Sequence, residues 1–299
     1  MKSDEARGFA LIGSGAVLLG TASILVRIAF PISALEVAFG RLAVAAVFVA
    51  AIAFFRSELR GWLGDARPYS LFGAIMALHF ITFVGSLALT SIAHSLSIVY
   101  LAPAIIAIAS VRVLGERLRP LQIAGIVLSI IGIAVLTGFE RTLTLRMLAG
   151  DVLAFASAVF FAAYSIIGRI RRASMPVFAY TSRVYVWAAI WALPFALYGA
   201  FSDFDPSDYT WTRVGAIALS GLLPIGIGRT LYNASMRYIS ATKTNLVATQ
   251  EITGGVILAA ILLAEIPSAT SIIGAVINLA GIFLVILGGR PLRRPSRRR

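Results

Sequence analysis

Long apolar blocks dominate this chain, and each is about as long as a helix that crosses a lipid bilayer. A helix needs roughly 20 residues to cross ~30 Å of hydrocarbon. Only 13% of the residues are charged, whereas soluble domains carry about 25%. The sequence therefore predicts an all-α integral membrane protein with ten transmembrane helices. The expected spans run approximately over 8–28, 32–55, 68–88, 92–113, 119–138, 148–170, 177–200, 212–233, 241–264 and 268–289.

The same composition argues against several other classes of protein. The first apolar block is too long for a cleaved signal peptide and lacks a small-x-small cleavage site. The chain has no cysteine, and its 2 histidines lack metal-binding spacing, so we expect no metal site and no cofactor. The net charge of +13 comes from arginines at block ends and in the tail. With no soluble domain to hold a binding groove, nucleic-acid binding is not expected.

Basic residues between the blocks predict the orientation of the chain. With a cytoplasmic N-terminus, 19 lysines and arginines lie on the cytoplasmic side, 4 on the opposite side and 3 within spans. Multi-pass proteins carry their excess of Lys and Arg in cytoplasmic loops. The sequence therefore predicts cytoplasmic N- and C-termini in a cell inner (plasma) membrane. The Arg-rich tail is expected to set this topology or to bind anionic lipid headgroups.

The second half of the chain repeats the first half at an offset of about 145 residues. Glu116 recurs 149 positions later as Glu265, and Arg41 recurs 142 positions later as Arg183. Each half holds five predicted spans, an odd number, so the second half must enter the membrane in the opposite sense. The sequence therefore predicts a first five-helix repeat, a second inverted repeat and a basic cytoplasmic tail, at residues 1–145, 146–289 and 290–299.

Topology, length and repeat together resemble the drug/metabolite transporter superfamily, in its EamA-type branch, through the matched elements Gly115-Glu116-Arg117 and Ala264-Glu265-Ile266. In that branch each half has a glutamate after its fourth helix and a Gly-rich fifth helix, and an arginine is frequent at the place of Arg41. Within the branch, the chain is most similar to the aromatic amino acid exporters of the YddG type, through His79, Tyr100 and Gln250-Glu251. The resemblance implies export of amino acids or related metabolites from the cytoplasm.

Polar and aromatic side chains inside the spans are the candidates for binding substrate. An ionisable group within a membrane costs several kcal/mol unless it faces a cavity or a partner. Glu251 is expected either to bind a substrate ammonium group or a proton, or to pair with Arg229 and hold helices together. His79 and Phe83 share one helical face, which forms a cavity wall or packs against another helix. The predicted substrate-binding residues are His79, Phe83, Tyr100, Tyr164, Gln250 and Glu251.

A second set of residues is expected to act in gating or to hold helices together. The two prolines can kink their spans and let a gate open and close, although proline is often simply tolerated in membrane helices. The symmetry-related arginines are expected in structural or gate-related ion pairs rather than at the substrate. The matched glutamates, at helix boundaries, are expected to cap helix N-termini. This set comprises Arg41, Arg183, Arg229, Pro103, Pro224, Glu116 and Glu265.

The fifth and tenth predicted spans are uniformly apolar and share a glycine pattern, in which Gly125 and Gly132 recur as Gly274 and Gly281. Small residues let membrane helices pack closely. These two spans are therefore expected to be peripheral supports, or alternatively to form a dimer face.

The whole pattern predicts a secondary transporter. It would export small metabolites, amino acids including aromatic ones, by alternating access around a midplane cavity between the halves. No GxxxxGK[ST] motif is present, so direct coupling to ATP is not expected, whereas proton coupling and facilitated efflux both stay open. The same fold with drugs, sugars or nucleotide derivatives as cargo is the close alternative. A membrane-embedded enzyme lacks support because no nucleophile or metal spacing accompanies Glu251, His79 and Arg229, and a receptor would need an extramembrane domain.

Overall fold

The computed structural model describes residues 2–58, 66–113, 118–138, 144–172, 176–202, 204–235, 238–239, 244 and 247–288. This part of the chain is built from helices and contains no strand. Its first helices are α1 (Lys2–Gly20), α2 (Ala22–Ala29), α3 (Ala34–Phe55), α4 (Ala66–Leu89), α5 (Ile92–Val99), α6 (Ala102–Val113) and α7 (Pro120–Gly138). They are followed by α8 (Leu145–Arg172), α9 (Val177–Ser202), the 3-10 helix η1 (Pro206–Asp208), α10 (Trp211–Ser220), the π-helix η2 (Gly221–Gly228), α11 (Arg229–Ser235), α13 (Gln250–Leu263) and α14 (Ala269–Gly288).

The prediction of a multi-pass helical membrane protein is confirmed. Eight helical segments of the described residues are long and apolar enough to cross a membrane. Two shorter apolar helices, Pro120–Val135 and Gln250–Leu263, stand at the places of the fifth and ninth predicted spans. Part of the ninth predicted span lies outside the described residues, so the count of ten spans stays a prediction.

Several helices begin where a side chain can replace a missing backbone partner. The first N–H groups of a helix have no partner within the helix, and Ser, Thr and Asp side chains accept from them. Ser91 Oγ accepts from His94 N at the start of α5, and Thr210 Oγ1 accepts from Arg213 N at the start of α10. Asp205 caps η1 in the same way. These caps fix the residues at which α5, α10 and η1 begin.

In the part of the chain that the structure describes, four of the predicted spans are interrupted rather than continuous: the first, the fourth, the eighth and, at Thr249, the ninth. The first is divided at Thr21 between α1 and α2, and the fourth is divided between α5 and α6 after Tyr100. The eighth passes from α10 through the π-helical η2 into α11. Pro224 lies inside η2, and Pro103 lies in the first turn of α6, where a missing backbone N–H interrupts no helical bond. Both prolines therefore accompany helix irregularities, and their role in gating stays a prediction.

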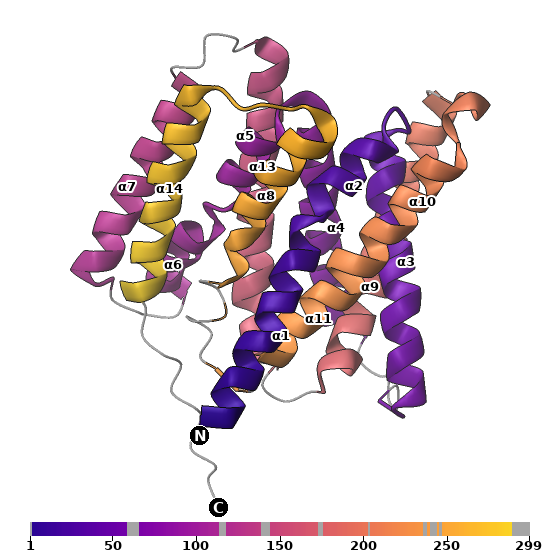
Figure 1. Cartoon of the computed structure of the whole chain (residues 1–299). Helices are drawn as coiled ribbons and strands as arrows, with labels where there is room; N and C mark the ends of the chain where they lie inside the picture. Colours follow the sequence, from indigo (N-terminus) through magenta and orange to yellow (C-terminus); the bar gives the residue numbers. More distant parts are fainter. Residues whose placement is uncertain are drawn as a thin grey trace, which may run out of the picture.

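Helices from the two predicted repeats pack against one another throughout the molecule. α4 packs against α8 and α9, and α3 packs against α9 and η2. α1 packs against α11 and α13, while α7 and α14 run side by side at one edge (Figure 1). The two halves of the chain are thus interleaved, so any cavity in the middle is lined by both.

The glycine pattern of the fifth and tenth predicted spans lies at the contact between α7 and α14. A Cβ atom on Gly125 would lie 2.6 Å from the carbonyl oxygen of Gly281, and one on Gly281 would lie 2.5 Å from Ser129 N. A Cβ on Gly132 would meet the backbone of Asn278. Because no ordinary Cβ contact is this short, these glycines let the two helices approach closely. The outer faces of both helices expose apolar side chains, including Ile123, Val127, Ile130, Ile131, Ile272, Ile273 and Val276.

Candidate functional site

A central cavity lies between elements of the two predicted repeats. It offers about 80 Å³ to the centres of water-sized molecules. One water takes ~10–15 Å³ by this measure, so the space suits roughly half a dozen waters or one molecule the size of an amino acid. Its polar lining residues are Arg41, His79, Tyr100, Arg229, Tyr232, Thr249 and Glu251, and three of its aromatic ones are Phe80, Phe83 and Phe161.

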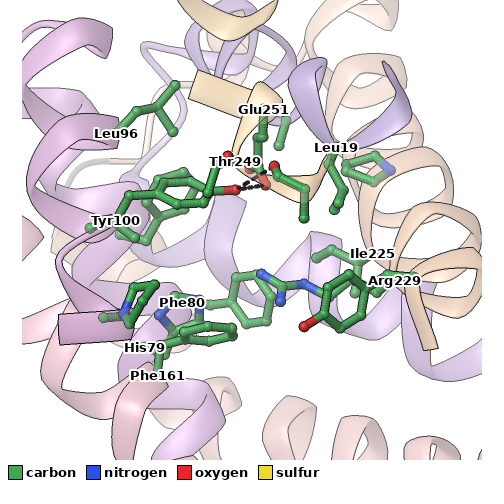
Figure 2. Close-up of a pocket in the computed structure, with 18 of the residues that line it drawn as sticks. Leu19, His79, Phe80, Leu96, Tyr100, Phe161, Ile225, Arg229, Thr249 and Glu251 are labelled. Carbon is green, nitrogen blue, oxygen red and sulfur yellow. Dashed lines mark hydrogen bonds between the residues drawn. The ribbon is translucent and has the colours of Figure 1, made fainter. Parts of the chain in front are cut away.

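Glu251 and Tyr100 face each other at the cavity from α13 and from the break between α5 and α6. The Tyr100 hydroxyl donates a hydrogen bond to Glu251 Oε2 and lies 3.4 Å from the carbonyl oxygen of Ala248 (Figure 2). Tyr100 and Thr249 are 149 positions apart, the offset of the repeat, and a helix is interrupted at each. Interrupted helices at a midplane cavity are typical of secondary transporters.

His79 lies on α4 among aromatic rings at the cavity wall. Its Nδ1 lies 3.1 Å from the carbonyl oxygen of Ser157 and 2.8 Å from Ser157 Oγ. A carbonyl oxygen can only accept, so Nδ1 carries the proton. The ring centroid is 4.9 Å from that of Phe80 and 5.1 Å from that of Phe161. Both roles considered for His79 therefore meet here, because the imidazole binds a neighbouring helix and also lines the cavity.

Arg41 lies at the cavity, whereas the sequence predicted for it a structural or gate-related ion pair away from the substrate. Its side chain is 1% exposed, and it lines the cavity instead of lying apart from it. The guanidinium carbon lies 5.1 Å from the ring centroid of Phe80 and 5.7 Å from that of Phe83. Among the described residues, Nε and Nη1 of Arg41 have no hydrogen-bond partner and no carboxylate pairs with the guanidinium. The expected ion pair is thus replaced by contacts with aromatic faces.

The other two arginines of the spans also contact aromatic rings. Arg229 lines the cavity, where its guanidinium carbon lies 4.9 Å from the ring centroid of Phe161. The described ion pairs do not include Arg229 with Glu251, which was the alternative considered for the glutamate. Arg183 is buried over the ring of Tyr69 at 5.0 Å and is not among the cavity-lining residues. The symmetry mates Arg41 and Arg183 therefore differ in access to the cavity.

The structure does not bring every predicted substrate-binding residue to this cavity. His79, Phe83, Tyr100 and Glu251 line it together. Tyr164 is instead packed in an apolar cluster, and Gln250 is exposed. Gln250 and Glu251 are adjacent on α13, so their side chains point in different directions around the helix axis, and the packing of α13 decides which of the two faces the cavity.

Several cavity-lining residues had no place in the sequence prediction. Tyr232 follows Arg229 by three positions, a spacing that puts both on one helical face. Thr249 follows Tyr100 at the offset of the repeat. Both spacings are visible in the sequence, although neither was used in the prediction. Phe80 and Phe161 carry no such signal, because a lone apolar aromatic in a membrane helix faces lipid as often as a cavity.

Glu265 caps a helix, as predicted, but the helix belongs to the other predicted repeat. Its Oε1 accepts from Ile92 N at 2.6 Å, at the start of α5, and its Oε2 lies 3.2 Å from Arg27 Nη2. Arg27 also donates to the carbonyl oxygen of Thr90 at 2.9 Å. Glu116, the symmetry mate of Glu265, lies outside the described residues.

A buried polar cluster continues from this cap into the protein. Thr90 Oγ1 donates to Asp151 Oδ1 at 3.0 Å, and His94 Nδ1 lies 3.1 Å from Asp151 Oδ2. His94 Nε2 lies 3.3 Å from Ser271 Oγ, which completes a Ser–His–Asp order. Ser271 is 2% exposed and lines neither of the described cavities. In this setting the cluster ties α5, α8 and α14 together.

Comparison with known proteins assigns nearly the whole chain to a family. The family model described as "EamA-like transporter family" matches residues 6–138 and 148–287. The chain belongs to the EamA-like transporter family. The predicted membership of the drug/metabolite transporter superfamily, EamA-type branch, is thereby confirmed. This family membership makes the chain a multi-pass membrane protein, which is surrounded by lipid, and a transporter whose substrates are small molecules.

Two individual comparisons add to this assignment. The chain is 22% identical over 217 residues to "Uncharacterized transporter YxxF" of Bacillus subtilis (strain 168), which covers 72% of this chain and 68% of that protein. A solved crystal structure with 22% identity superposes with a TM-score of 0.65 over 96% of this chain and 97% of the other. The second likeness concerns the fold alone.

Proposed function

We propose that this EamA-family transporter exports amino acids, aromatic ones included, across the cell inner membrane by alternating access around the central cavity. The observation that carries the proposal is the composition of that one cavity. It combines two guanidinium groups and a carboxylate with several aromatic rings, from Arg41, Arg229, Glu251, Phe80, Phe83 and Phe161. An aromatic amino acid has a carboxylate, an ammonium group and a planar apolar body, so each part meets a complementary group.

The ammonium group and the side chain of an aromatic amino acid each have a chemically complementary part of the cavity lining. The Glu251 carboxylate, oriented by the Tyr100 hydroxyl, suits an ammonium group. The rings of Phe80 and Phe161, which flank His79, suit a planar side chain by offset or edge contacts. Because α4 and α13 come from different predicted repeats, a substrate held between them would be released when the repeats move apart.

Counterflow of labelled phenylalanine into proteoliposomes tests the proposal directly. We expect uptake by the wild-type protein, together with a loss of at least tenfold in Glu251→Gln and a weaker loss in His79→Ala. A hydrogen bond to a charged group contributes ~1.5–3 kcal/mol, which corresponds to roughly 10- to 100-fold in affinity. Glu36→Gln is the matched control, since Glu36 makes its described bond to Tyr209, away from the cavity.

The substrate panel decides between the proposal and its rival. The same proteoliposomes are tested with a cationic drug, a sugar and a nucleotide derivative. Transport of one of these without transport of any amino acid would refute amino acid export while leaving the family assignment intact. Unchanged rate and affinity for phenylalanine in both Glu251→Gln and His79→Ala, in correctly inserted protein, would remove these two residues from the binding site.

A further inference from the structure

We propose that Arg41 is the anion-binding residue of the cavity and that the transporter therefore selects substrates carrying a carboxylate beside an apolar body. The inference rests on the proposed function, since it concerns the same cavity, and it names the substrate class that this cavity takes. The sequence predicted a structural or gate-related ion pair for Arg41, whereas this inference assigns it a contact with the substrate.

The first observation is that hydrogen-bond donors of Arg41 are buried without acceptors. Nε and Nη1 have no partner in the part of the chain that the structure describes, although the side chain is 1% exposed. Polar atoms buried in proteins are almost always hydrogen-bonded, and an unpaired charge within a membrane is costly. The rings of Phe80 and Phe83 attract the cation but offer no acceptor in the plane of the guanidinium. The site is therefore incomplete without an acceptor from outside the chain.

The second observation is the balance of charge in the cavity. Arg41 and Arg229 bring two positive charges close to the single carboxylate of Glu251, near enough for the three to interact. Glu251 already accepts a hydrogen bond from Tyr100, and Arg229 lies over the ring of Phe161. One positive charge therefore has no counterpart among the cavity-lining groups. A ligand without a carboxylate group would leave this guanidinium unpaired, whereas the carboxylate of an acid or of a zwitterionic amino acid would pair with it.

The chemistry of the guanidinium narrows the ligand group further. Its planar fork presents N–H donors that match the two oxygens of a carboxylate, often in a bidentate pair. The cavity suits one molecule of about amino-acid size, as its volume indicates. Beside Arg41 stand the rings of Phe80 and Phe83, which would cover the apolar part of that molecule. These features together point to a small carboxylate with an apolar or aromatic body, with or without an ammonium group.

Four related compounds separate the groups that the site recognises. Competition against labelled phenylalanine on the purified wild-type protein compares phenylalanine, 3-phenylpropionate, phenethylamine and phenylalaninamide. We expect the first two, which carry a carboxylate, to compete at least tenfold more strongly than the last two. Phenylalaninamide keeps the ammonium group and the ring, so weak competition by it isolates the contribution of the carboxylate.

Variants of Arg41 then connect this preference to the residue. We expect Arg41→Gln to raise the Kd of phenylalanine at least tenfold and to abolish the preference for carboxylates, with Arg41→Lys intermediate because it keeps the charge but loses the fork. Arg183→Gln is the matched control, since Arg183 is also a buried arginine over an aromatic ring but does not line the cavity. It should keep the wild-type order of the four compounds. Size-exclusion and melting profiles select folded variants, and Arg41→Lys provides the test should Arg41→Gln fail to fold.

Different results overturn different statements. If phenylalanine is transported but its Kd is unchanged in folded Arg41→Gln or Arg41→Lys, Arg41 is not the anion-binding residue, and the proposed function stands. Equal competition by phenylalaninamide and phenylalanine would likewise overturn the inference. If no amino acid binds but 3-phenylpropionate, labelled directly, binds in an Arg41-dependent manner, the proposed function fails and the assignment of Arg41 is supported.

Discussion

Tyr209 illustrates how a single side chain ties a loop to a distant helix. It follows η1, and its hydroxyl donates to Glu36 Oε1, at the start of α3, at 2.6 Å. Burial of the phenol, followed by this hydrogen bond, raises the pKa of Tyr209 to about 12 from its ordinary value near 10. The bond therefore fastens the segment between α9 and α10 to α3 over the whole physiological pH range.

The first prediction concerns the pH dependence of this bond. Because the pKa of Tyr209 is higher in the folded protein, the bond stabilises fully below pH 10 and is lost as the pH rises through about 12. The phenolate absorbance of the wild type minus that of Tyr209→Phe should titrate near pH 12, and in Glu36→Gln the midpoint should fall. A difference titration centred at pH 10 would show that the bond is absent in solution.

In-span polarity identified most of the cavity's polar lining at the level of single residues. His79, Tyr100 and Glu251 were predicted because ionisable or hydroxyl groups are costly in lipid, and all three line the cavity. The same argument found Arg41 but assigned it an ion pair, since an isolated sequence cannot show that aromatic faces surround the guanidinium. Their roles in binding substrate stay predictions until the transport experiments are done.

At the scale of elements, the contact between α7 and α14 depends on side chains that are absent. Gly125, Gly132 and Gly281 place the backbones of α7 and α14 against each other, and Asn278 Nδ2 of α14 donates to the carbonyl oxygen of Ser97 in α5 at 2.6 Å. Without a hydrophobic force between helices in lipid, such close packing and buried hydrogen bonds hold membrane helices together. Three of the repeated glycines, Gly125, Gly132 and Gly281, are therefore explained by this interface.

The second prediction follows from that interface. Gly281→Ala would put a Cβ 2.5 Å from Ser129 N and 2.6 Å from the carbonyl oxygen of Gly125, so α7 and α14 must separate. We expect the free energy of unfolding to fall by about 1–3 kcal/mol, seen as a lower apparent melting temperature. Gly215→Ala in α10 is the matched control, since no atom lies within 4 Å of its added Cβ. Equal melting temperatures for Gly281→Ala and Gly215→Ala would contradict the packing argument.

Helix irregularities were only partly visible in the sequence. Pro103 and Pro224 predicted disturbance in the fourth and eighth spans, and irregular helix is found at both. The break at Thr21 and the one at Thr249 have no proline beside them. These breaks depend on how neighbouring helices pack, because irregular backbone within a membrane is tolerated only where protein or a cavity surrounds it.

At the scale of the whole molecule, polar contacts join the two predicted repeats at one end. Arg27 and the start of α5 meet Glu265, and His94 meets Asp151 and Ser271. In the predicted orientation this end faces outward. Because each of these bonds crosses between residues 1–145 and 146–289, we expect them to hold the predicted repeats together there and to break if the cavity opens outward.

The third prediction tests that closure. Glu265→Gln keeps an acceptor for Ile92 N but removes the charge that attracts Arg27, whose side chain is 25% exposed. A partly exposed ion pair contributes about 1 kcal/mol, enough for a roughly fivefold shift between closed and open forms. The natural chain has no cysteine, so Val99→Cys provides a single reporter in the cavity lining. Its reaction with a membrane-impermeant thiol reagent outside intact cells should speed up several-fold in Glu265→Gln.

The control uses another ion pair of the structure. Arg213 and Asp208 pair at 3.2 Å within one loop and helix start, so this pair joins no two repeats. Asp208→Asn with the same Val99→Cys reporter should react at the rate of the reporter alone. Unchanged labelling in Glu265→Gln, or an equal increase in Asp208→Asn, would show that the contacts of Glu265 do not restrain outward opening.

The sequence by itself determined the helical membrane architecture and the family, because each span's hydropathy and backbone hydrogen bonding are local properties of one segment. It also predicted the two repeats, because the matching residues are visible in residue order alone. Only the tertiary structure decided which side chains share the cavity, that Nε and Nη1 of Arg41 have no acceptor among the described residues, and which helix Glu265 caps. Those facts depend on the rotation, tilt and interruption of each helix, which are set by packing against neighbours distant in the chain.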